Sequence, residues 1–189
     1  MKTSYAIPLG LRRGMVKLSP HDERWGALAK ETVSKLIDGL RGIALGIEHV
    51  GSTAIPGIHA KPILDFAVGV EDLDSVLPFL DRLRDCGIHL VHDARPRELL
   101  FAEGKVEADF ITSHIHVIPF DGEEWRNYLD FRDYLLAHQD EAKRYETLKI
   151  ALAERYGDDR KQYTAGKGDA IAEILKKAHR WRACQNDQD

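Results

Sequence analysis

The chain has 189 residues, of which 43% are hydrophobic and 31% charged, and its formal net charge is −4. This length and composition are those of one globular domain that can bury a core. The negative charge argues against a dedicated nucleic-acid-binding protein, which usually has an excess of basic residues. Two cysteines provide neither a disulfide framework nor a metal site, and no apolar run is long enough to span a membrane. We therefore expect a cytoplasmic protein with reduced thiols.

The N-terminal part predicts an arm followed by one amphipathic helix. Residues 1–16 have no periodicity, so we expect them to be loose or docked on the domain. Ser19 and Pro20 predict the helix start, with the serine as N-cap and the proline at the first helical position. The helix is expected to end at Gly42. Its apolar face keeps helical spacing and consists of Trp25, Leu28, Thr32, Val33, Leu36, Ile37 and Leu40.

The middle of the chain predicts a small β-sheet. Between the second and third strands we expect a helix that stops at Gly87, with an irregular first turn because Pro78 lies inside it. Turns are expected near Arg95-Pro96 and Glu103-Gly104. Dense apolar and β-branched residues predict strands at 43–50, 62–70, 88–92, 97–102 and 109–118.

From Glu123 onward the periodic segments are all helical, with three apolar faces. We expect a single domain at 17–181, with an α/β core over about 17–121 and a helical C-terminal part over about 122–181. Residues 182–189 are polar and predict a frayed tail. This layout indicates an α+β or α/β protein with helices around a small mixed sheet.

The segment 48–65, EHVGSTAIPGIHAKPILD, carries the main indication of chemistry. Asp65 lies alone among the apolar residues of PILDFAV, and burying a lone carboxylate costs on the order of several kcal/mol unless a cation or donors meet it. The pair Gly51-Ser52 could let the backbone approach a phosphate while the hydroxyl donates a hydrogen bond. The functional interpretation is a metal or phosphate-bound cation between Asp65 and this pair. The alternatives are a plain turn and an ion pair of Asp65 with Lys61 or an arginine.

Strand alternation indicates which side chains lie on the same face of each strand. Ala67 lies on the same face, at the position where a metal-binding D-x-D pair would have its second acid. In SHIHVIPF, residues 113–120, alternation places His114 and His116 together on one face. Two imidazoles there could bind a transition metal or transfer protons, or they could be solvated residues on the polar side of the strand.

The 48–65 segment, together with HIHV, FRDYLLAH, YETLK and YTAGK, resembles the GrpB-like family, which is assigned to the nucleotidyltransferase superfold. The resemblance runs from about Val16 to Ala178. It implies an α+β protein with a nucleotidyltransferase-like mixed β-sheet core, flanking helices, and a helical C-terminal part that closes over a cleft.

The resemblance also implies roles for individual residues. Gly51 and Ser52 would hold a triphosphate, Asp65 would bind Mg²⁺ or Mn²⁺, and His116 would stand where the superfold often has a further carboxylate. The expected catalytic and metal-binding residues are therefore Asp65 and His116. The expected substrate-binding residues are Gly51, Ser52, Thr53, Lys61, Lys149, Tyr163 and Lys167.

Three functions remain open at this point. The first is a metal-dependent nucleotidyltransferase that uses a nucleoside triphosphate on a small molecule. The second is a catalytically inactive protein that binds a nucleotide or another anionic metabolite, with a link to coenzyme A metabolism because some family members are fused to dephospho-CoA kinase. The third is a hydrolase or metal site centred on His114 and His116. Ala67 favours the second, whereas the retention of Asp65 favours the first, because an acid repels phosphate unless a cation stands between them.

Overall fold

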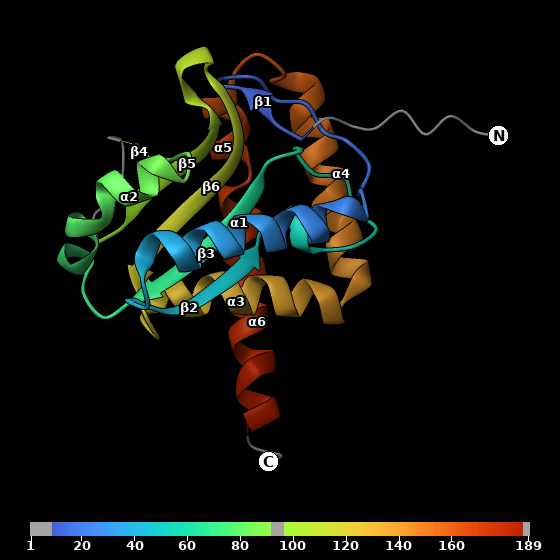
Figure 1. The fold of residues 1–189 in the computed structure, drawn as a ribbon. Helices are drawn as coiled ribbons and strands as arrows, with labels where there is room; N and C mark the ends of the chain where they lie inside the picture. The colour runs from blue at the N-terminus through green and yellow to red at the C-terminus, as the bar shows by residue number, and fades with distance from the viewer. Residues whose placement is uncertain (1–8, 92–96, 187–189) are drawn as a thin grey trace.

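A mixed β-sheet lies at the centre of the molecule, with helices on both of its faces (Figure 1). The structure is a computed structural model and describes residues 9–91 and 97–186. The strand order is β2-β3-β6-β5-β4, and β1 pairs with β6. β3 and β6 run parallel, while the other paired strands are antiparallel. The strands are β1 (Leu11–Arg12), β2 (Ala44–Val50), β3 (Leu64–Val70), β4 (Ile88–Val91), β5 (Leu99–Lys105) and β6 (Phe110–Pro119).

The helices divide between the two faces of the sheet. α1 and α2 contribute to the core cluster on one face, and α3 to the cluster on the other. The C-terminal helices follow one another after β6. No helix in the described ranges is long and apolar enough to cross a membrane. The helices are α1 (Arg24–Leu40), α2 (Leu80–Asp85), α3 (Glu123–Ala137), α4 (Gln139–Arg155), α5 (Arg160–Gly166) and α6 (Gly168–Asn186), with short 3₁₀ turns at Ser52–Ala54, Leu73–Phe79 and Val106–Ala108.

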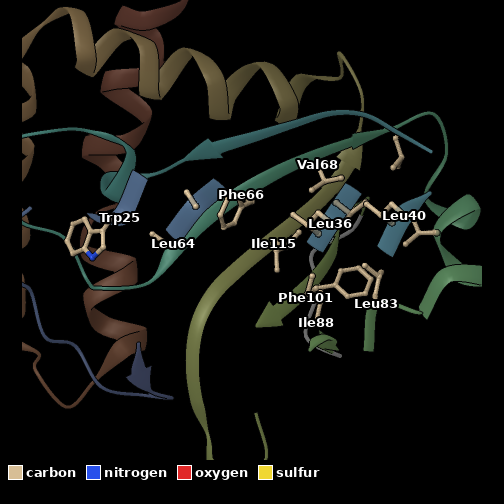
Figure 2. Packing of buried hydrophobic residues seen from close by; sticks show 14 of the residues in the cluster. Trp25, Leu36, Leu40, Leu64, Phe66, Val68, Leu83, Ile88, Phe101 and Ile115 are labelled. Atoms are coloured by element: carbon tan, nitrogen blue, oxygen red, sulfur yellow. The ribbon is translucent and has the colours of Figure 1, made fainter. Parts of the chain in front are cut away.

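The main core fills the space between α1 and the sheet (Figure 2). Leu64 and Phe66 of β3 and Ile115 of β6 are fully buried there, against Trp25 and Leu36 of α1. Burying each such side chain stabilises the fold by about 1.5–3 kcal/mol. This cluster therefore fixes which face of β3 and β6 points away from α1.

On the opposite face, α3 covers only part of the sheet. Trp125 packs there on Val50, Ala67 and Ile118. Ala67 is completely buried in this contact, so the position expected for a second acid is filled by packing. The remaining part of this face is met by side chains from α4, α5 and α6, and a cleft lies between them.

The start of the first helix differs from the prediction. Ser19 does not cap α1; its backbone pairs with Ala60 in an isolated β-bridge. α1 begins at Arg24, whose N–H donates to the Asp22 carboxylate over 3.0 Å. Ile37, which we expected on the apolar face, is 56% exposed. Pairing with Ala60 is preferred over N-capping because it gives both the N–H and the C=O of Ser19 a hydrogen-bond partner.

Four other predictions concern turns and the ends of elements. The irregular start around Pro78 is confirmed, because Leu73–Phe79 is a 3₁₀ segment that precedes α2. The turn at Glu103-Gly104 was wrong: both residues belong to β5, where the register with β6 shifts by a bulge. α6 continues to Asn186, so residues 182–186 are helical rather than frayed. The turn expected at Arg95-Pro96 lies outside the described residues.

Candidate functional site

The pairing of β3 with β6 builds the centre of the site. In the parallel register Asp65 lies beside His114, and Ala67 beside His116. The Asp65 Oδ1 atom is 3.5 Å from His114 Nδ1 and 4.0 Å from His116 Nε2. The faces expected from strand alternation are thus the observed ones, and one carboxylate meets two imidazoles.

Gly51 allows the neighbouring strand to approach this carboxylate. Its backbone has φ 68° and ψ −169°, a conformation available almost only to glycine. A Cβ atom at this position would lie 2.7 Å from Asp65 Oδ2. The structure therefore places Asp65 against the Gly51-Ser52 bend, as the sequence led us to expect.

His116 is held between two carboxylates. Its Nδ1 atom lies 2.5 Å from Glu98 Oε1, while Nε2 points toward Asp65. Burial would lower the pKa of His116, but the hydrogen bonds and charges of Asp65 and Glu98 win and raise it to about 9. Burial would likewise raise the pKa of Asp65, yet His114 and His116 hold it far below its usual range. Asp65 is therefore ionised and faces a protonated imidazole.

Four cationic side chains share a hollow with Asp65, which we call the basic lobe. It has a volume of about 210 Å³. Among the described residues that line it, Asp65 is the only acid. The lobe is lined by Ser52, Thr53, Ala60, Lys61, Ile63, Asp65, Leu100, His114, His116, Lys149, Arg160, Tyr163, Thr164 and Lys167.

The lysines of the basic lobe are costly to keep charged. Burial and the nearby Lys167 lower the pKa of Lys149 to about 7 and that of Lys61 to about 8. Burial also lowers the pKa of Lys167 itself. The Lys167 Nζ atom lies 4.7 Å from the centre of the Tyr163 ring. This cation–π contact offsets only part of the cost of burying the charge. An anion in this lobe would stabilise all three ammonium groups.

A second hollow, the aromatic lobe, adjoins the basic lobe on the side of the C-terminal helices. Its volume is about 300 Å³. Ser52, Asp65, His116 and Lys167 line both lobes, so the two form one cleft. The residues that line only the aromatic lobe are Gly51, Glu124, Asn127, Tyr128, Phe131, Tyr145, Ile171 and Leu175.

Other polar residues of the region hold the loop between β2 and β3 in place. The Glu146 carboxylate accepts hydrogen bonds from the backbone and ring of His59 over 2.5 and 2.7 Å. The Lys149 ammonium donates to the His59 carbonyl over 2.6 Å. His49 shares a hydrogen bond with the Thr53 hydroxyl. These contacts give His59 of the loop and His49 near the end of β2 structural roles.

All nine residues predicted from the sequence line one or the other lobe. Glu98 and Arg160 were missed. Arg160 lies three residues before Tyr163 in α5, and this helical spacing could have indicated a common face. Glu98 has no such local pattern, because the pairing of β5 with β6 brings it to His116.

Together, fold and site define an α+β protein whose mixed sheet presents one aspartate to a cation-lined cleft under a helical C-terminal part. Residues 15–177 match the family described as GrpB protein. The chain therefore belongs to the GrpB family. It is 39% identical to the glutamate-rich protein GrpB of Alkalihalophilus pseudofirmus over 88% of this chain and 98% of that protein.

Solved structures and a longer relative extend this comparison. The crystal structure of the conserved protein GrpB from Enterococcus faecalis covers 86% of this chain and 96% of its own, with a TM-score of 0.78 and 29% identity. A chain of Cid1 in complex with its short product ApU matches with a TM-score of only 0.46 and 15% identity, covering 73% of this chain and 43% of its own. A dephospho-CoA kinase of Mycolicibacterium paratuberculosis is 27% identical over 90% of this chain, which spans 48% of that protein.

Replacing Gly51 tests the close approach to Asp65. Gly51→Ala should lower the free energy of unfolding by about 1–3 kcal/mol, because the residue is held in a glycine conformation, and the clash with the carboxylate adds to this. The matched control is Gly57→Ala, where φ is 82° but nothing lies within 4 Å of the added Cβ. Urea unfolding should give a larger loss for Gly51→Ala; equal losses would show that the carboxylate is not crowded there.

Proposed function

We propose that the cleft binds the phosphate groups of an anionic small molecule, such as a nucleotide. The observation that carries the proposal is the gathering of Lys61, Lys149, Arg160 and Lys167 around a hollow whose lining includes only one acid. Hydrogen bonds from such cations to phosphate are about twice as strong as neutral ones. Lys149 also has a structural role, because it anchors the loop. Within the described ranges the ammonium groups of Lys61 and Lys167 have only contacts with the Tyr163 ring, and the Arg160 side chain has no hydrogen bond or ion pair.

Lys167 gives the sharpest test of phosphate binding. Lys167→Ala should weaken binding of inorganic tripolyphosphate by about 10- to 100-fold, because a hydrogen bond to a charged group contributes about 1.5–3 kcal/mol. Isothermal titration calorimetry measures this directly. The matched control is Lys176→Ala, which removes the same charge from an exposed position on α6. Failure of tripolyphosphate to bind the wild type, or an equal loss in both variants, would refute the proposal.

The same lysines predict a pH dependence. An anion binds the protonated lobe, so affinity should be highest below about pH 7 and should fall as the pH rises through the values near 7 and 8 of Lys149 and Lys61. Binding at pH 8 should accordingly take up protons. Calorimetry in two buffers of different ionisation enthalpy measures this uptake. Affinity that stays constant between pH 6.5 and 9 would contradict the assignment of these lysines to the site.

Metal-dependent nucleotidyl transfer is the second candidate, and the meeting of Asp65 with His116 favours it. A carboxylate and a neutral imidazole are both metal ligands, so a cation between them would take the place of the proton on His116 Nε2. Glu98 on the other ring nitrogen would orient the histidine, as outer carboxylates do in metal sites. Among the described residues no group of three or more acidic, histidine or cysteine side chains forms a metal site. Mg²⁺ or Mn²⁺ would thus need phosphate oxygens of the ligand as additional partners.

Asp65 separates the two candidates. If a cation bridges Asp65 and the ligand, Mn²⁺ should tighten nucleoside triphosphate binding to the wild type but not to Asp65→Asn, and only the wild type should release pyrophosphate. Thermal shift and a pyrophosphate assay measure the two effects. If the cation changes nothing in the wild type, the transferase candidate fails and the binding protein remains. The relative named dephospho-CoA kinase makes coenzyme A intermediates worth including among the ligands.

A further inference from the structure

We propose that the ligand of the basic lobe also carries a flat, polar-edged ring, and that this ring binds in the aromatic lobe. The inference rests on the proposed binding of phosphate in the basic lobe. It restricts the substrate class to phosphorylated heteroaromatic compounds and excludes inorganic polyphosphate as the natural ligand.

The continuity of the cleft supports one ligand rather than two. Ser52, Asp65, His116 and Lys167 form the wall common to both lobes. A molecule whose phosphates contact Lys61 and Lys167 can therefore extend past this wall into the second hollow. At about 300 Å³ the aromatic lobe lies at the lower end of the volumes usual for small-molecule sites.

The lining of the aromatic lobe fits a flat ring. Tyr128, Phe131 and Tyr145 contribute aromatic surfaces from α3 and α4, while Ile171 and Leu175 of α6 contribute aliphatic ones. Phe131 and Tyr145 meet edge to face, with their ring centres 5.5 Å apart at 82°. Such surfaces give a bare phosphate chain little to bind, whereas a nucleobase stacks favourably on an aromatic residue.

Two polar side chains at the lobe suit a ring with hydrogen-bonding edges. The Asn127 Oδ1 atom pairs with His179 Nε2 over 2.9 Å, which leaves the amide hydrogens to donate. Glu124, exposed on α3, offers a carboxylate acceptor. An apolar ring would leave both groups unused, so a heteroaromatic ring matches the lining better.

The test compares the same substitution at a phenylalanine that lines the aromatic lobe and at one that does not. Phe131→Leu keeps an apolar side chain but removes the flat surface from the lobe. The matched control, Phe120→Leu, makes the same change at a 42% exposed residue that does not line the lobe. Calorimetry with tripolyphosphate and with each of the four ribonucleoside triphosphates follows the two halves of the ligand separately.

In the wild type at least one nucleoside triphosphate should bind about fivefold or more tightly than tripolyphosphate. Phe131→Leu should lose most of this advantage with tripolyphosphate binding unchanged, and Phe120→Leu should keep it. If tripolyphosphate binds but no nucleotide binds more tightly, the inference fails while phosphate binding stands. If tripolyphosphate itself does not bind, the proposed function fails first.

Discussion

The parallel alignment of β3 with β6 is the constraint on which the cleft depends. It sets Asp65 directly beside His114 and leaves His116 one step further along the same face. A slip by one residue would turn these side chains toward the apolar core, so the buried leucine, phenylalanine and isoleucine residues under α1 also determine the chemistry on the other side. Fold stability and site geometry thus have a common origin.

Whether a buried group of the cleft is stable in its charged form depends on whether a group of opposite charge lies beside it. Burial alone would neutralise Asp65, His116 and the lysines, but the carboxylates and imidazoles stabilise one another in their charged forms. Within the described residues Lys61 and Lys149 form no ion pair with an acid, and burial lowers their pKa values. The site is therefore satisfied around Asp65 and short of negative charge around its lysines, which is the electrostatic condition that favours an anionic ligand.

Local sequence patterns were sufficient for most of the site. Alternation predicted that Asp65 and Ala67 share one face of β3 and that His114 and His116 share one face of β6, and the resemblance to the family brought in Lys149, Tyr163 and Lys167. Contacts between distant segments were not predictable in this way. Glu98 reaches His116 only through the β5–β6 register. Ser19 has a good capping sequence, yet its backbone pairs with the loop after β2, because tertiary hydrogen bonds override a local preference of about 1 kcal/mol.

The ammonium group of Lys149 has two roles. It donates to the His59 carbonyl, and so fastens the loop between β2 and β3 to α4, while it also lines the basic lobe. If a phosphate drew this ammonium toward itself, the loop would lose one of its hydrogen bonds and Glu146 would still hold it. Under the proposed function, occupancy of the cleft and rigidity of the loop are therefore linked through the flexible lysine stem.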